Sequence, residues 1–226
     1  MFRFIAHRGN DDALLENTKE AILNALSKPY IDGVEFDIRI TKDNHFIIHH
    51  NATILDNKES GLIKNMTLKQ LKKVEFKKQQ RKYKLATLKE VLKEIDNQKI
   101  IIIEIKEETD YSLYQKKKLI RLLNNYSNLN IYLVSFNYKL ISSIKEMYEN
   151  SGLLIGKVLN RNKDITKFPF LLMPLDFYKK YEGVQEIFIW TINETRQLKD
   201  IKEKDYIITD KAYELFMSPY NHHKSL

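Results

Sequence analysis

The chain has 226 residues, with 38 Lys or Arg against 30 Asp or Glu, a net charge of +8 and no cysteine. This length fits one large domain, and the lack of cysteine excludes disulfides, thiolate metal sites and cysteine nucleophiles. The sequence contains no run of ~18 apolar residues that could span a membrane, and its start is too short and polar for a signal peptide. We therefore expect a cytoplasmic protein without a transmembrane segment.

The first segment predicts a strand followed by a helix. Residues 3–6 are a short apolar run followed by His-Arg-Gly at 7–9, which predicts a buried strand with polar side chains at its carboxyl end. Asn17 or Thr18 can cap the helix that follows, and Pro29 ends it.

A β-hairpin is predicted next. Residues 34–40 alternate between apolar and charged side chains, so Glu35, Asp37 and Arg39 share one face of a strand. A polar turn and the apolar run 46–48 follow directly, which is typical of a fold-back.

The register of this hairpin gathers titratable groups. If the turn is centred on Asp43 and Asn44, Ile40 opposes Phe46, and His50 returns to the level of the two carboxylates. Carboxylates two residues apart on a strand can bind Mg²⁺ or Ca²⁺, and an adjacent imidazole can transfer protons. The same alternation is also typical of a solvated strand face.

The remaining chain alternates helical and strand-like segments. An irregular stretch at 51–65 precedes two threonine-capped amphipathic helices, at 67–74 and 87–95. Residues 99–106 predict an apolar strand interrupted only by Glu104 and Lys106, on one face near its carboxyl end. Further strands are predicted at 131–136, 153–158, 170–173, 187–192 and 206–209.

Eight apolar strands, mostly separated by helices, predict an α/β fold of the (β/α)₈ TIM-barrel type. Functional residues of such barrels gather at the carboxyl ends of the strands. The hairpin then belongs to an insertion after the second strand, at about 41–82, within a single domain covering 1–226.

Several short motifs stand at these strand ends and in the hairpin. In chain order they are H-R-G at 7–9, E-N-T at 16–18, E-x-D at 35–37, T-K-D at 41–43, a histidine at 50, E-x-K at 104–106, S-F at 135–136, W-T-x-N at 190–193 and T-D at 209–210. In this order the sequence resembles the glycerophosphodiester phosphodiesterase family over most of the chain. The resemblance implies a barrel with an inserted lid that hydrolyses glycerophosphodiesters to glycerol phosphate and an alcohol.

The resemblance also implies roles for individual residues. It implies a divalent cation, Ca²⁺ or Mg²⁺, held by Glu35, Asp37 and Glu104, with His7 and His50 as catalytic acid and base. The substrate would be a small-molecule phosphodiester. The oligomeric state is left open.

Three further side chains are candidates for substrate binding. Arg8 can bind a phosphate oxygen through its guanidinium fork, or it can pair with Glu16. Lys106 is either a phosphate ligand or a partner of Glu104, and Trp190 either walls the pocket or fills the barrel.

The chain departs from the family pattern around the hairpin. Leu15 replaces the proline before E-N-T, Asn44 replaces a turn glycine, and Asp56 lies near a position where the family often has arginine. Asn51 replaces the aspartate that commonly follows the second histidine, and neutral asparagine can only hydrogen-bond to His50. These departures bear on which substrate is bound more than on which reaction is catalysed. Asn51 and Asn193 are candidate supporting polar groups.

Other functions are weighed against this one. Lysophospholipase D-like cleavage of lipid phosphodiesters would use the same site but calls for an apolar lid, and residues 54–55 and 62–63 offer a thin one. A non-catalytic phosphodiester-binding barrel would be expected to lack a metal ligand or a histidine, and none is missing. Nucleic-acid binding needs basic residues interleaved with aromatics. Only the run 76–84 (FKKQQRKYK) fits, and we expect an exposed helix end or loop there rather than a contact with anionic lipid or substrate.

Overall fold

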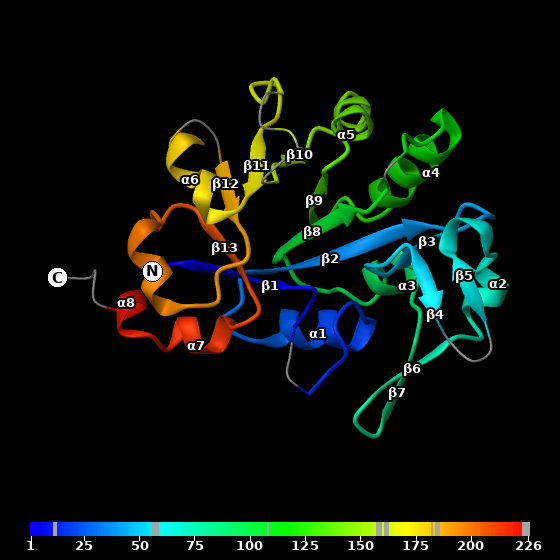
Figure 1. Ribbon diagram of the computed structural model, residues 1–226, viewed down its shortest axis with the longest axis horizontal. Coiled ribbons are helices and arrows are strands. Elements are labelled where there is room, and N and C mark those ends of the chain that lie inside the picture. Colours follow the sequence, from blue (N-terminus) through cyan, green and yellow to red (C-terminus); the bar gives the residue numbers. More distant parts are fainter. Residues whose placement is uncertain are drawn as a thin grey trace.

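The computed structural model describes residues 1–10, 13–55, 59–107, 109–156, 160, 163–181, 183 and 186–222. Eight parallel strands pair in a closed ring in the order β1, β2, β8, β9, β10, β11, β12, β13 and back to β1 (Figure 1). Their bounds are β1 Arg3–His7, β2 Gly33–Ile40, β8 Ile100–Ile105, β9 Asn130–Ser135, β10 Ser151–Leu154, β11 Phe170–Met173, β12 Glu186–Ile189 and β13 Tyr206–Thr209. The predicted (β/α)₈ barrel is confirmed.

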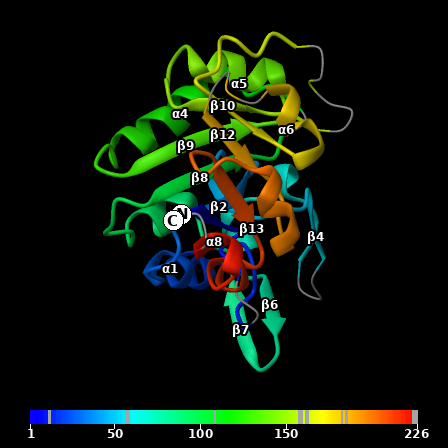
Figure 2. The same ribbon diagram turned by 90° about the vertical axis from the view of Figure 1, so that its left-hand side faces the viewer.

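Helices cover the outside of the ring, with α1 and α7 on one side and α4, α5 and α6 on the other (Figures 1 and 2). Side-chain caps set several of their starts: Thr18 accepts a hydrogen bond from the backbone of Ala21, and Ser112 forms a capping box with Gln115. The helices are α1 Lys19–Ser27, α3 Leu88–Leu92, α4 Leu113–Asn124, α5 Tyr138–Lys145, α6 Leu175–Tyr181, η2 Thr195–Asp200, α7 Ala212–Phe216 and α8 Pro219–His222. None of the helices in the described part of the chain is long and apolar enough to cross a membrane.

The strands bury two different faces. Val34, Phe36 and Ile38 of β2 pack into the outer core between the barrel and its helices. Because successive side chains of a strand alternate in direction, Glu35 and Asp37 face the opposite way, toward the interior of the barrel. The interior itself is filled by the apolar side chains of Ile5, Ile100, Ile102, Val134, Leu154, Phe170, Leu172, Phe188, Tyr206 and Ile208.

The predicted hairpin has the predicted register. β3 Phe46–Ile48 pairs antiparallel with β2, and Ile40 lies opposite Phe46. The backbone N–H of His49 donates to the carbonyl of Asp37 at 3.0 Å, so the fold-back continues beyond the ladder toward the site.

The segment that follows the hairpin has its own small core. It contains β4 Thr53–Leu55, β5 Ser60–Leu62, η1 Ile63–Asn65, α2 Leu68–Leu71, β6 Glu75–Lys78 and β7 Arg81–Lys84. Together with Ile47 of β3, the buried side chains of this core are Ile54, Ile63, Met66, Leu71, Val74 and Leu85.

Some local predictions are wrong or too long. The stretch 51–65, expected to be irregular, contains the β4–β5 hairpin, and the basic run 76–84 lies in the β6–β7 hairpin rather than a helix end or loop. Short two-stranded ribbons have little apolar periodicity, so the sequence pattern misses them. The strand predicted to 192 ends at Ile189, and the predicted strand positions 157–158, like Asp56, lie outside the described residues.

Gly33 lies where β2 passes closest to β8. A Cβ there would lie 2.4 Å from the backbone oxygen of Ile100 and 2.8 Å from Cδ1 of Ile5. That oxygen belongs to a barrel strand and cannot move without disturbing strand pairing. We expect Gly33→Ala to lower the free energy of unfolding by about 1–3 kcal/mol, measured by urea denaturation. The exposed helix position Lys117→Ala should change it by about 0.5 kcal/mol or less, and equal midpoints for both variants would contradict this reading of the packing.

Candidate active site

Three carboxylates converge at the carboxyl ends of two neighbouring strands. Glu35 and Asp37 come from β2 and Glu104 from β8, and Asp37 lies directly beside Glu104 in the parallel register. One oxygen of each carboxylate lies within 4.8 Å of the others. The structure therefore brings together the three residues predicted as metal ligands.

Burial of this cluster disfavours the charged forms of its carboxyl groups. The pKa of Glu35 is raised, first because burial disfavours its charge and then because Asp37 repels it. Burial and Asp37 also raise the pKa of Glu104, although the ammonium group of Lys106 opposes the rise. A cation among these carboxyl groups would favour their charged forms.

Two cationic side chains lie against the cluster. Lys106 Nζ is 2.9 Å from Glu104 Oε1 and 3.8 Å from Asp37 Oδ1, and Arg8 Nε is 3.5 Å from Asp37 Oδ2. Arg8 also donates to Glu16 at 2.7 Å. The Arg8–Glu16 and Lys106–Glu104 pairs considered from the sequence are therefore both present. The side chains of Arg8 and Lys106 also line the pocket described below.

A turn after β1 supports the carboxylates through its backbone and side chains. The backbone N–H of Arg8 donates to Glu35 Oε2 at 3.1 Å, with Arg8 in the left-handed region at φ 56°. Asn17 donates to Asp37 Oδ2 at 2.7 Å and accepts from the backbone of Asp37 at 3.0 Å. This two-point contact fixes the orientation of the Asp37 carboxylate.

His7 lies between two carboxylates. Its Nδ1 is 2.7 Å from Asp210 Oδ1, and its Nε2 is 4.0 Å from Glu35 Oε2. Burial opposes the charged imidazole, but the Asp210 hydrogen bond and the Glu35 charge outweigh it, so the pKa of His7 is raised. A carboxylate on Nδ1 fixes the proton there and leaves Nε2 to face the site.

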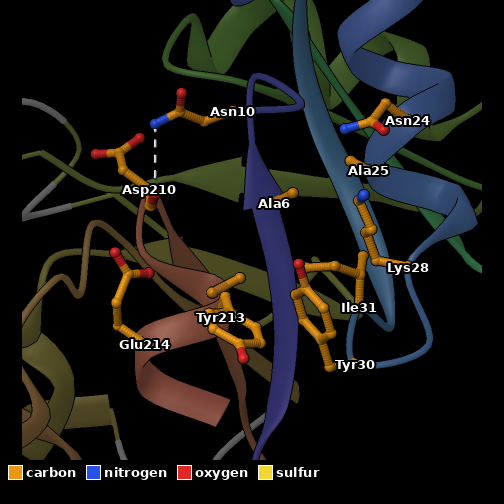
Figure 3. A pocket seen from close by; sticks show the side chains of 11 residues that line it. Ala6, Asn10, Asn24, Ala25, Lys28, Tyr30, Ile31, Asp210, Tyr213 and Glu214 are labelled. Atoms are coloured by element: carbon orange, nitrogen blue, oxygen red, sulfur yellow. Dashed lines mark hydrogen bonds between the residues drawn. The ribbon is translucent and has the colours of Figure 1, made fainter. Parts of the chain in front are cut away.

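Asp210 is itself held from two sides. Asn193 donates to Asp210 Oδ2 at 2.8 Å and accepts from its backbone N–H at 2.8 Å. Asn10 donates to the carbonyl of Asp210 at 3.4 Å (Figure 3). The Asn10 contact borders a separate pocket outside the barrel that α1 and α7 help to line. The ring of His7 is thus fixed by a supported carboxylate.

His50 has a different environment. It follows the hairpin, and its Nδ1 lies 2.9 Å from Asn51 Oδ1. Burial lowers the pKa of His50, and the charges of Lys106 and Arg8 add to this effect, while the Asn51 contact opposes it. The two histidines therefore have pKa values displaced in opposite directions.

These groups line a cavity of about 280 Å³. Its polar side holds His7, Arg8, Glu35, His50, Glu104 and Lys106. Its other side is apolar and is formed by Phe136, Leu154, Leu172, Trp190 and Ile208. The Trp190 ring meets Phe136 edge-on at 5.9 Å, so Trp190 lies in the pocket wall.

Sequence reasoning gave no role to Asp210 and considered Asn17 only as a possible helix cap, whereas Thr18 is the cap and Asn17 contacts Asp37. Both stand in motifs that had been matched, T-D and E-N-T, and their positions next to strand or helix ends were the available signal. The contact of Asp210 with His7 joins residues 203 positions apart, and local patterns do not reveal such a pairing. Asn193, interpreted as a supporting group, contacts Asp210 as described.

Asn51 offers a test through the pH profile. An aspartate at this position would place a negative charge beside the His50 imidazole and raise its pKa. We expect Asn51→Asp to move the limb of the pH–rate curve set by His50 to higher pH, measured as kcat/KM against pH on one substrate. Asn65→Asp, which adds the same charge at an exposed position, should leave both limbs in place. If Asn51→Asp changes neither limb, the hydrogen bond has no influence on proton transfer.

The comparisons with known proteins agree on one family. A family model described as glycerophosphoryl diester phosphodiesterase matches residues 7–204. A glycerophosphodiester phosphodiesterase of Caldanaerobacter subterraneus subsp. tengcongensis is 28% identical and covers 91% of this chain and 93% of its own length.

Two solved structures share the fold. The glycerophosphodiester phosphodiesterase of Thermotoga maritima is 25% identical with a TM-score of 0.71, covering 96% of this chain and 97% of its own. A phosphodiesterase of Oleispira antarctica, solved in complex with the product sn-glycerol-3-phosphate, has a TM-score of 0.75 at 20% identity, covering 94% of each chain. The chain described here belongs to the glycerophosphoryl diester phosphodiesterase family and is a phosphodiesterase.

Proposed function

We propose that this phosphodiesterase hydrolyses glycerophosphodiesters to glycerol phosphate and an alcohol, using a divalent cation and a pair of histidines. The observation that carries the proposal is a cavity lined by two of the three clustered carboxylates, Glu35 and Glu104, and by two histidines with oppositely shifted pKa values. The names of the relatives support the substrate class, since one is a glycerophosphodiester phosphodiesterase and another was solved with sn-glycerol-3-phosphate.

The carboxylate cluster fits a hard cation. Its donors are all carboxylate oxygens, which Ca²⁺ and Mg²⁺ prefer. Two oxygens on opposite sides of a Ca²⁺ lie roughly 4.6–5.2 Å apart, and roughly 4.0–4.2 Å apart for Mg²⁺. A spread of up to 4.8 Å among Glu35, Asp37 and Glu104 is compatible with the larger ion as it stands. When bound, the cation would neutralise these carboxylates and polarise a phosphate oxygen.

The protein's own cations and imidazoles supply the remaining steps. Arg8 and Lys106 bind the other phosphate oxygens from the polar side of the cavity. His50, with a lowered pKa, is neutral near pH 7 and accepts a proton from the attacking water or substrate hydroxyl. His7, with a raised pKa, donates a proton through Nε2 to the leaving alcohol. Trp190 packs against the carbon skeleton of the substrate.

Metal dependence is tested by removing one ligand charge. We expect Glu35→Gln to weaken cation binding and activity together, because the amide keeps the shape but not the charge of the carboxylate. Release of glycerol phosphate from glycerophosphocholine is measured after chelation and again after adding Ca²⁺ or Mg²⁺. Glu94→Gln, a charge change on the surface, serves as the control. Full activity of the unaltered protein in excess chelator would remove the cation from the mechanism.

The two histidines are tested separately. His7→Ala and His50→Ala should each lower kcat by about 10² or more, since positioned proton transfer contributes about 10²–10⁴. His45→Ala, a histidine outside the pocket lining, should retain the rate of the unaltered protein. Circular dichroism establishes that each variant is folded. A near-normal kcat in either of the first two variants would exclude that histidine as acid or base.

Cleavage of lipid phosphodiesters is the second candidate function. It is favoured by the apolar half of the cavity and by the exposure of Leu55 and Leu62 on the β4–β5 hairpin, at 83% and 40%. The ratio of kcat/KM for glycerophosphocholine and lysophosphatidylcholine, measured with one preparation, distinguishes the two substrates.

A further inference from the structure

The hairpin formed by β6 and β7 projects from the body of the molecule. It extends beyond α1 at the bottom of Figure 1, and the view turned by 90° in Figure 2 shows the same projection. We call residues 75–84 the basic arm. It has one acidic residue, Glu75, and five basic ones, namely Lys77, Lys78, Arg81, Lys82 and Lys84.

The pairing of the arm places like charges opposite each other. Lys77 faces Lys82, and Lys78 faces Arg81, across the antiparallel ladder. Like charges in directly opposed positions destabilise a sheet, and a two-stranded ribbon has little stability to spare. Stability of the fold therefore does not explain why these side chains are basic.

Much of this charge is not neutralised within the protein. Lys82 pairs with Glu75 at 3.1 Å. Within the described ranges, Lys77, Arg81 and Lys84 are exposed and make no ion pair. The arm thus carries positive charge that is available to a partner.

The two faces of the arm have different surroundings. One face holds the arm on the body: the Phe76 ring stacks on His49 at 5.7 Å, Tyr83 is buried, and Lys78 donates to the carbonyl of Leu14 at 2.6 Å. The other face carries Lys77, Lys82 and Lys84 together with Glu75, the partner of Lys82, so these side chains point away from that contact.

The anchoring contacts tie the arm to the active-site segments. His49 directly precedes His50, which lines the catalytic cavity. Leu14 belongs to the connection between β1 and α1, which also carries Arg8. A surface bound by the arm would therefore lie near the segments that form the mouth of the cavity.

We propose that the exposed face of the basic arm binds the anionic surface of a phospholipid membrane. Lys or Arg residues held near such a surface each strengthen binding by about fivefold, without needing a shaped pocket. Single-stranded nucleic acid fits less well, because it is held by bases stacked on exposed aromatic rings. Both aromatic residues of the arm, Phe76 and Tyr83, are on the anchoring face. This binding does not depend on the reaction proposed above.

The test uses the full chain and phosphatidylcholine vesicles with or without phosphatidylglycerol, with binding measured by co-sedimentation. The unaltered protein should bind only the anionic vesicles and should dissociate when salt is raised to about 0.5 M. The triple variant Lys77→Gln, Lys82→Gln and Lys84→Gln, which removes the positive charge of the exposed face, should bind them about 100-fold more weakly. The control variant Lys117→Gln, Lys139→Gln and Lys199→Gln loses the same charge from exposed positions away from the arm and should bind much as the unaltered protein does.

Three results would overturn the proposal. Equal binding to neutral vesicles would mean that anionic charge is not what is recognised. Equal losses in both triple variants would mean that net charge rather than the arm controls binding. Tighter binding of single-stranded DNA than of anionic vesicles, lost in the arm variant, would assign the arm to nucleic acid. Thermal melting establishes that both variants are folded, and no turnover is measured, so failure of the proposed reaction cannot mimic these outcomes.

Discussion

The burial of three carboxylates at the ends of β2 and β8 is the constraint on which the surrounding structure depends. Like charges in a poorly solvated site cannot all be ionised unless cations or hydrogen-bond donors face them. Arg8 and Lys106 supply two cations, and Asn17 and the backbone of Arg8 supply donors. Among the described residues this support still leaves the pKa values of Glu35 and Glu104 raised. A buried cluster of carboxylate oxygens of this kind could hold a hard cation.

The conformation of the turn after β1 explains why histidine, arginine and glycine follow one another there. Arg8 and Gly9 both adopt left-handed backbone conformations, and a Cβ on Gly9 would lie 2.8 Å from the backbone of Ala21 in α1. Only glycine fits between the turn and the helix. The same turn aims the Arg8 N–H at Glu35 and leaves His7 at the end of β1, next to Asp210 after β13. Packing of α1 against the turn therefore holds His7 and the Arg8 N–H in these positions.

The sequence predicts the barrel well because most of its strands are short, continuous apolar runs bounded by polar residues, while β2 shows a clear alternation of apolar and charged side chains. It also predicts the hairpin register, because the turn between Ile40 and Phe46 leaves little freedom. The support of His7 by Asp210 could not be predicted in the same way, since it exists only once β13 closes the ring against β1. The sequence pattern does not reveal the β6–β7 ribbon, because each of its strands has a single apolar residue, Phe76 or Tyr83, among lysines and other polar residues.

The two histidines differ because their partners differ. Asp210 is a carboxylate, so it stabilises the charged form of His7, whereas Asn51 is neutral and leaves burial to dominate at His50. A family member with aspartate beside the second histidine would favour protonation of both rings. In this chain asparagine at residue 51 adds no negative charge beside His50, so burial is not outweighed there as it is at His7. The opposite displacements of the two pKa values fit the proposed division into one proton donor and one proton acceptor.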